Sequence, residues 1–209
     1  MNFFTETFST AKLGGALMLP LSLVCILAIA LIFDKILFYK KSLQLPESLR
    51  SLIETYNFSW VDLEAQLKKL PQKNSYRNFL EVILQNRSKP VWWLESRAGD
   101  EAKQVEKKLN SSLWILETIV TVAPLLGLLG TIVGMMSSFK IIGDAGLVNP
   151  SGVTAGVAES LIATGFGLAV AIFALFAFNY FSQKTNEVLD EMERLATRII
   201  DHIKLDEKL

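Results

Sequence analysis

The chain has 209 residues, and its 21 Lys and Arg are balanced by 21 Asp and Glu, so the formal net charge is zero. This balance argues against a nucleic-acid-binding protein, which needs a basic excess to neutralise phosphates. Although 20% of the residues are charged, 51% are hydrophobic and the mean hydropathy is +0.35. These values fit together only if charged and apolar residues are segregated along the chain, which argues against a wholly water-soluble protein.

The segregation is complete in three windows that lack Asp, Glu, Lys, Arg and His: residues 13–33, 118–139 and 160–183. The windows contain 21, 22 and 24 residues, and a helix needs about 20 apolar residues to cross a bilayer. The sequence therefore predicts three transmembrane helices. The first window is too long for the core of a secretory signal peptide, and no small-residue cleavage site follows it.

The distribution of basic residues predicts the orientation of these helices. Of the 21 Lys and Arg, 14 lie in residues 34–112 and 5 lie after residue 182, which leaves Lys12 and Lys140. Because basic residues are enriched in cytoplasmic loops, we expect the N-terminus to be outside and the C-terminus inside. The connection 143–152 is rich in Gly, Asn and Pro, which predicts a short external turn between two antiparallel spans.

The predicted fold is an all-α integral membrane protein. It has three transmembrane helices, two of which continue as long cytoplasmic helices, and a small cytoplasmic helical bundle. The expected segments are an external N-terminal segment (1–12), transmembrane helix 1 (13–38), a cytoplasmic helical domain (39–112), transmembrane helix 2 (113–142), the external turn (143–152), transmembrane helix 3 (153–182) and a cytoplasmic C-terminal helix (183–209).

Three short amphipathic helices are expected within residues 39–90. Pro46 begins the first, since proline suits the first turn of a helix. Ser59, with Asp62 three residues later, resembles an N-cap for the second, which Pro71 ends. The third carries its apolar residues between Phe79 and Leu84.

Apolar residues continue at helical spacing on the cytoplasmic side of the second and third spans. From Leu94 to Leu116 they recur every three or four residues, which predicts one helix continuous from about 92 to 141. Between Val188 and Ile203 they do the same, which predicts a helix over about 153–205. Two such long helices indicate an extension built by several subunits, unless the C-terminal tail lies on the membrane surface. His202, in this charged tail, is expected to be solvated.

Small and hydroxylated residues line one face of each of the last two spans. In the second span Gly127, Thr131, Gly134 and Ser138 share a face, and in the third Ala155, Glu159, Ala163, Gly167 and Ala171 form a four-residue row. Small residues let helices approach closely in lipid. We therefore expect a face for helix packing or for a pore, formed by Gly127, Gly130, Gly134, Ser160, Ala163 and Gly167.

Thr131 and Thr164 are predicted to form a polar layer. At 1.5 Å per residue they lie about 4 and 5 Å outward from the centres of two oppositely directed spans, hence at similar height. The alternative is that each hydroxyl bonds a carbonyl of its own helix. Glu159 lies about 13 Å outward from the centre of its span. It is either a functional acid, a carboxylate stabilised by the helix N-terminus or a residue in contact with water at the outer interface.

The middle of the spans contains no Asp, Glu, His or Lys. If the protein conducts protons, the titrating group must come from another chain, which favours a complex over a lone channel. One Cys and one His support no catalytic set, cofactor or metal site, so we expect no enzyme. The alternatives are a non-conducting structural membrane scaffold and a solute-permease subunit, for which the spans lack a mixed polar pocket.

Two stretches resemble a known family. Residues 123–135 carry an A-P-x-x-G-x-x-G-T pattern, and residues 156–168 carry A-E-x-L-x-A-T. These resemble the second and third spans of the MotA/TolQ/ExbB proton-channel proteins. The ExbB/TolQ-like subunits fit better than MotA, which has a fourth span, and residues 39–90 match no motif of the family.

The resemblance implies a homopentamer in the bacterial inner membrane. Single-span partners of the ExbD or TolR type, each with a membrane aspartate, would pass through its pore. The proton-motive force would then drive work at the outer membrane through a TonB- or TolA-like protein, for TonB-dependent uptake or a Tol-Pal-type process. By motif position, Thr131 and Thr164 correspond to pore-lining threonines that face the aspartate, and Glu159 corresponds to an outer-end glutamate.

Overall fold

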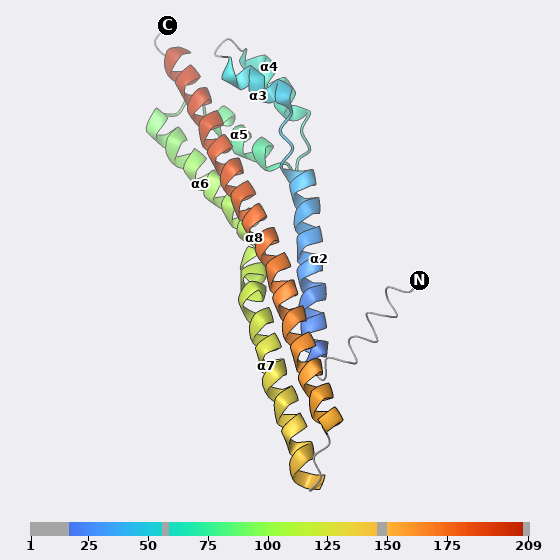
Figure 1. Ribbon diagram of the computed structural model, residues 1–209. Coiled ribbons are helices and arrows are strands. Elements are labelled where there is room, and N and C mark those ends of the chain that lie inside the picture. Colours follow the sequence, from blue (N-terminus) through green and yellow to red (C-terminus); the bar gives the residue numbers. More distant parts are fainter. Residues whose placement is uncertain (1–16, 56–58, 146–149, 207–209) are drawn as a thin grey trace, which may run out of the picture. The chain divides into compact units, whose positions relative to one another are not determined.

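The computed structural model describes residues 17–55, 59–145 and 150–206, without the side chains of 140–153. The expected N-terminal segment 1–12, residues 13–16 of the first span, the middle of the turn 143–152 and the last three residues lie outside this description. All regular structure among the described residues is helical (Figure 1). The helices are α2 (Met18–Ser42), α3 (Glu47–Glu54), α4 (Trp60–Lys68), α5 (Ser75–Gln85), α6 (Val91–Asn110), α7 (Leu113–Ala145) and α8 (Pro150–Asp206).

Three stretches are long and apolar enough to cross a membrane: Met18–Ser42, Val91–Phe139 and Thr154–Asp206. They contain the three charge-free windows, apart from residues 13–17 of the first. In the most apolar part of each stretch, only 17%, 22% and 28% of the residues are buried within the chain. Exposed apolar surface of this extent requires lipid or other protein chains around it.

The chain divides into two compact units, which we call the apolar unit (residues up to Ile32 and 113–179) and the charged unit (33–112 and 180–209). In the apolar unit the start of α2 contributes Met18 and Leu21 to a small cluster with Ala163 of α8. Leu126 of α7 and Phe166 of α8 pack against this cluster. Contacts from all three helices therefore hold the described part of this unit together.

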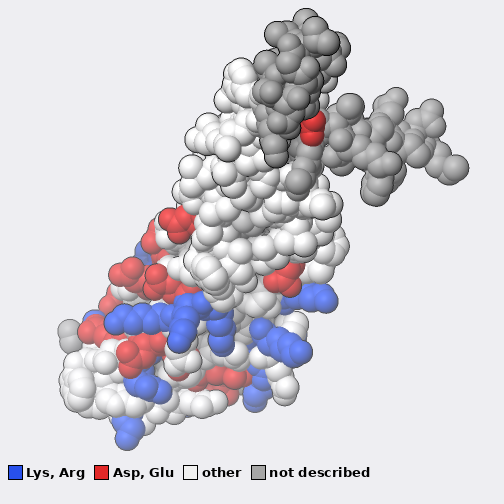
Figure 2. All heavy atoms as spheres, turned by 90° about the horizontal axis from the view of Figure 1, so that it is seen from below, with Lys and Arg blue, Asp and Glu red and all other residues white. Residues whose placement is uncertain are grey.

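The charged unit has a larger core, to which α3, α4, α5, α6 and the end of α8 all contribute. Each of the three predicted short helices is present, as α3, α4 and α5. The Ser59 side chain accepts a hydrogen bond from the Asp62 backbone N–H at 3.2 Å, as its N-cap signature predicts. The long amphipathic faces are also buried, from Leu94 to Leu109 in α6 and from Val188 to Ile203 in α8. Figure 2 shows Lys, Arg, Asp and Glu gathered on one part of the surface, with another part almost free of them.

The helix expected to run without a break from about 92 to 141 is two helices. Helix α6 ends at Asn110 and α7 begins at Leu113, with Ser111 and Ser112 between them. The Ser111 hydroxyl donates to the Lys108 carbonyl at 2.9 Å, a local bond that competes with the regular backbone ladder. Sharp kinks in helices occur where a side chain inserts into the backbone ladder in this way. The connection between α7 and α8 is shorter than 143–152, because α7 reaches Ala145 and α8 begins at Pro150.

The expectation that His202 is solvated is wrong. Its side chain is only 12% exposed and its Nδ1 lies 3.5 Å from Asp206 Oδ2. Its ring meets the Trp60 ring edge-on at a centroid distance of 5.0 Å, and the Trp60 Nε1 donates to the same Asp206 oxygen at 2.8 Å. Trp60 of α4 therefore covers His202, although the charged residues around His202 in the sequence indicate an exposed position.

Lys35 of α2 is buried, with 2% of the residue exposed. Its ammonium donates to the Leu109 carbonyl at 2.5 Å, in the last turn of α6, where backbone carbonyls lack partners within the helix. A lysine in this position satisfies such a carbonyl and complements the helix dipole. Lys35 therefore stabilises the end of α6 within the charged unit.

We expect Lys35→Met to lower the free energy of unfolding by about 1–3 kcal/mol, because the buried Leu109 carbonyl loses its donor. Thermal unfolding of the purified protein in detergent, followed by circular dichroism, measures the change. Lys40→Met is the matched control, since Lys40 is exposed on the same helix. An equal effect of both substitutions would contradict the capping role.

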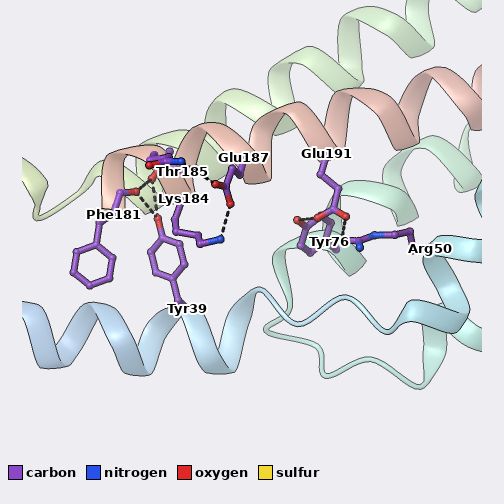
Figure 3. A network of polar contacts seen from close by, with 9 residues as sticks. Tyr39, Arg50, Tyr76, Phe181, Lys184, Thr185, Glu187 and Glu191 are labelled. Atoms are coloured by element: carbon purple, nitrogen blue, oxygen red, sulfur yellow. Dashed lines mark hydrogen bonds and ion pairs between the residues drawn. The ribbon is translucent and has the colours of Figure 1, made fainter. Parts of the chain in front are cut away.

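Glu191 of α8 joins α3 and α5 to the end of α8 (Figure 3). Its carboxylate accepts hydrogen bonds from the Arg50 guanidinium and from the Tyr76 hydroxyl. Burial and the hydrogen bond to the Glu191 carboxylate both raise the pKa of the Tyr76 phenol. The same view shows the Tyr39 hydroxyl of α2 beside Thr185 of α8, at 2.8 Å between oxygens.

The raised pKa of Tyr76 predicts a decline in stability at alkaline pH. The unfolded chain releases this proton near pH 10, whereas the folded chain retains it, so the contribution is complete below about pH 10 and is lost as pH rises further. We expect Tyr76→Phe to be less stable than the native chain at neutral pH but to lose less stability between about pH 9 and pH 11. Unfolding midpoints across that range test this, with Tyr180→Phe, at a residue 59% exposed, as the control. Parallel declines for native chain and Tyr76→Phe would count against it.

Candidate functional site

The α7–α8 contact in the apolar unit depends on glycines that admit the facing backbone. A Cβ added at Gly127 would lie 2.9 Å from the Thr164 Cα, and one at Gly167 would lie 2.5 Å from the Ala123 carbonyl oxygen. Real Cβ atoms do not come that close to backbone atoms. The two helices therefore approach so closely at these points that only glycine fits.

The same contact continues toward the connection between the helices. A Cβ at Gly130 would lie 2.9 Å from the Ala163 Cβ, and one at Gly134 would lie 2.8 Å from the Ser160 Cβ. The structure thus brings all six small residues of the expected face into one helix–helix contact: Gly127, Gly130, Gly134, Ser160, Ala163 and Gly167. It adds three residues that were not proposed as site residues: Ala123, which meets Gly167, and the pair Ser138 and Gly156, which meet each other.

The Thr164 hydroxyl crosses from α8 to α7. It donates to the Gly127 carbonyl at 2.7 Å. The Thr131 hydroxyl donates within α7, to the Leu128 carbonyl at 2.7 Å. Because Gly127 and Leu128 are consecutive, both hydroxyls bond at one level of α7. Both threonines are half-buried, but the Thr164 bond joins the two helices, whereas the Thr131 bond stays within its own helix.

These bonds determine what each hydroxyl can offer to a further group. A carbonyl oxygen has no proton, so each threonine must be the donor, and its oxygen lone pairs remain as acceptors. An acceptor pairs with a protonated carboxylic acid, whereas a carboxylate needs a donor. In this arrangement the threonine level suits the protonated form of an approaching acid, and it can stabilise the ionised form only if a hydroxyl turns away from its carbonyl.

Glu159 does not meet the two threonines. It lies five residues before Thr164 on α8, a rise of about 7.5 Å, and its side chain is half-buried. It is the one charged residue among the described side chains of 118–139 and 154–183. Burial increases along this row of α8, since Ala155 is exposed, Glu159 is half-buried and Ala163 is fully buried.

The outward faces of α7 and α8 are apolar. Leu128, Ile132, Leu161 and Leu168 are each between 46% and 62% exposed. Gly165 also faces open space, with nothing within 4 Å of an added Cβ. The helix pair therefore leaves long apolar surfaces for lipid or other chains on either side of the threonine level. Within the described residues, no three His, Cys, Asp or Glu side chains could hold a metal ion.

Comparison with known proteins supplies the wider context. The model of the MotA/TolQ/ExbB proton channel family matches residues 71–194, which include α7, the small-residue contact and both threonines. An ExbB-like biopolymer transport protein of Synechocystis is 35% identical over 175 residues, which cover 80% of this chain and 81% of that protein.

Two further relatives carry the names ExbB and TolQ. The biopolymer transport protein ExbB of Aquifex aeolicus is 38% identical over 116 residues, 56% of this chain and 75% of that protein. The Tol-Pal system protein TolQ of Pseudomonas aeruginosa is 39% identical over 84 residues, 40% of this chain and 36% of that protein.

Proposed function

Because this chain belongs to the MotA/TolQ/ExbB proton channel family, we propose that it is the proton-channel subunit of an energy-transducing complex in the bacterial inner membrane. It works there with an ExbD/TolR-like single-span partner that carries a membrane aspartate. The proton-motive force, transmitted through a TonB- or TolA-like protein, drives TonB-dependent uptake or a Tol-Pal-type process at the outer membrane.

The observation that carries this proposal is the pair of hydroxyls at one level of α7 in spans without a titrating group. Thr131 and Thr164 bond neighbouring carbonyls, and no Asp, Glu, His or Lys lies in 118–139 or 160–183. A proton pathway at this depth needs an acid from another chain. A partner aspartate supplies this acid, and several copies of this protein around the partner helix supply the threonines.

We propose the topology that the basic residues predict, with the N-terminus outside and the charged unit in the cytoplasm. Of the 21 Lys and Arg, 14 lie in residues 34–112 and 5 after residue 182, as the positive-inside rule expects of cytoplasmic segments. The partner helix and the other copies of a homopentamer cover the exposed apolar faces of α7 and α8.

The proposed cycle alternates two states of the partner acid. The protonated acid donates to a threonine oxygen, and deprotonation requires the hydroxyl to turn and donate to the carboxylate. An ionised group in hydrocarbon is costly, so it persists only at the threonine level. Each charge that moves through the field contributes about 2.3 kcal/mol per 100 mV, which can move the partner past successive subunits. Glu159 would receive or release protons at the outer end.

The test is proton flux into liposomes that contain this chain and its single-span partner, followed with a pH-sensitive dye under an imposed membrane potential. We expect flux only when both chains are present, and its loss when the partner's membrane aspartate is changed to asparagine. Glu159→Gln is expected to slow the flux in the same assay. An intact complex without flux would instead support the non-conducting scaffold.

A further inference from the structure

A groove in the charged unit lies apart from the threonine level. Its space is about 450 Å³, within the range of pockets that bind ligands. Helix α6 forms one bank and α8 the other, and Phe79 of α5 contributes to its lining. None of these residues takes part in the proposed proton pathway.

The groove is shaped to receive a helix. The α6 bank, from Glu95 to Glu106, carries Ala98, Gly99 and Ala102 at helical spacing between these two acids. Its length is about 16 Å, or three helical turns. Because these side chains are small, they leave the α6 side of the groove open, and nothing lies within 4 Å of a Cβ added at Gly99. A short helix with an apolar face can therefore lie along it, as in other helix-in-groove complexes.

The rim of the groove is acidic on both banks. Glu95 and Glu106 stand on α6, and Glu193 and Asp201 stand on α8. Two lysines, Lys103 and Lys204, also line it, so four carboxylates face two ammonium groups. The Lys204 Nζ lies 3.7 Å from the Glu95 Oε1 and 3.5 Å from the Asp201 Oδ1, so part of the negative charge is already compensated. The excess on the rim is negative and complements a ligand with basic flanks.

We propose that this α6–α8 groove binds a short amphipathic helix of a partner protein, with apolar residues on the floor and Lys or Arg against the acidic rim. The apolar floor contributes affinity, and the rim selects for basic flanks and orients the helix. The inference does not depend on proton conduction, because it concerns binding to the charged unit alone.

The probe is a fluorescent synthetic helix of about 12 residues, the length of three turns, with leucines on one face and lysines on both flanks. It is titrated by fluorescence anisotropy against the full chain in nanodiscs of neutral lipid, with empty nanodiscs as the blank. A second peptide carries glutamates in place of the lysines. We expect saturable binding of the lysine peptide only.

Three variants locate the binding. Gly99→Leu places a side chain in the groove, where nothing lies within 4 Å of its Cβ, and should weaken binding at least about tenfold. The double variant Glu106→Gln with Glu193→Gln should weaken it by about twofold to thirtyfold, since each exposed ion pair contributes about 0.2–1 kcal/mol. Glu64→Gln with Asp100→Asn removes the same charge outside the groove and should leave the affinity within about twofold.

Several results would overturn the proposal. They are the absence of saturable binding, equal binding of the two peptides, and equal binding by the native chain and Gly99→Leu. A change in the oligomeric mass of Gly99→Leu, measured by light scattering, would assign the groove to a contact between copies of this chain instead.

Discussion

Replacing Thr164 by valine is expected to reduce proton flux about tenfold to hundredfold while the complex still assembles. Valine keeps the shape of threonine but removes the hydroxyl that bonds the Gly127 carbonyl at 2.7 Å. In the proposed cycle the same hydroxyl accepts from the protonated partner acid and, once that acid is ionised, turns and donates to its carboxylate. A hydrogen bond to a charged group contributes about 1.5–3 kcal/mol, and each 1.4 kcal/mol added to the barrier slows a step about tenfold.

The controls separate the hydroxyl from general packing effects. Thr164→Ser restores a hydroxyl and should recover most of the flux. Thr118→Val removes a hydroxyl that bonds its own helix, to the Trp114 carbonyl at 2.8 Å, far from the threonine level, and should leave flux within about twofold. Size-exclusion chromatography with light scattering checks assembly of each variant. If Thr164→Val and Thr118→Val conduct alike, the threonine level has no role in conduction.

The helices were largely predictable from the sequence because each rests on a local signal. Charge-free windows indicate the three stretches that could cross a membrane, and Ser59 with Asp62 indicates the start of α4. The faces of α6 and α8 follow from apolar residues at helical spacing. These signals come from residues close together in the chain, where the physical cause acts over one or two turns.

Features that depend on distant parts of the chain were not predictable in this way. Lys35 is 74 residues from the carbonyl that it caps, and nothing in its neighbourhood distinguishes it from a positive-inside lysine. The burial of His202 depends on Trp60 of α4. The break at Ser111 and Ser112 has a local signal, two adjacent serines, but the prediction rested on the continuous apolar face and did not consider them.

The candidate site lies between these cases. Counting residues predicts a similar depth for Thr131 and Thr164. In the structure their hydroxyls donate to consecutive carbonyls of α7, those of Leu128 and Gly127. The direction of the Thr164 hydroxyl, toward the other helix, was not predictable. The hydroxyl reaches the other helix because α7 and α8 lie close together. That short distance depends on how the glycines pack in the folded chain.

Adding one methyl group at Gly167 is expected to disrupt the apolar unit, whereas the same change two residues earlier is harmless. A Cβ at Gly167 would lie 2.5 Å from the Ala123 carbonyl oxygen, and one at Gly165 would have nothing within 4 Å. Overpacking of this kind costs about 1–3 kcal/mol. Gly165→Ala should instead be neutral or slightly stabilising, because alanine favours helix by about 1 kcal/mol over glycine. Unfolding midpoints in detergent compare the two variants.

Gly127→Ala extends this prediction to the threonine level. Its Cβ would lie 2.9 Å from the Thr164 Cα, so α8 must move away and the bond from the Thr164 hydroxyl to the Gly127 carbonyl must lengthen. We therefore expect Gly127→Ala to lose flux as Thr164→Val does, and the double variant to lose little more than either alone, since both remove one interaction. Additive losses in the double variant would show that the glycine contact and the Thr164 hydroxyl act independently.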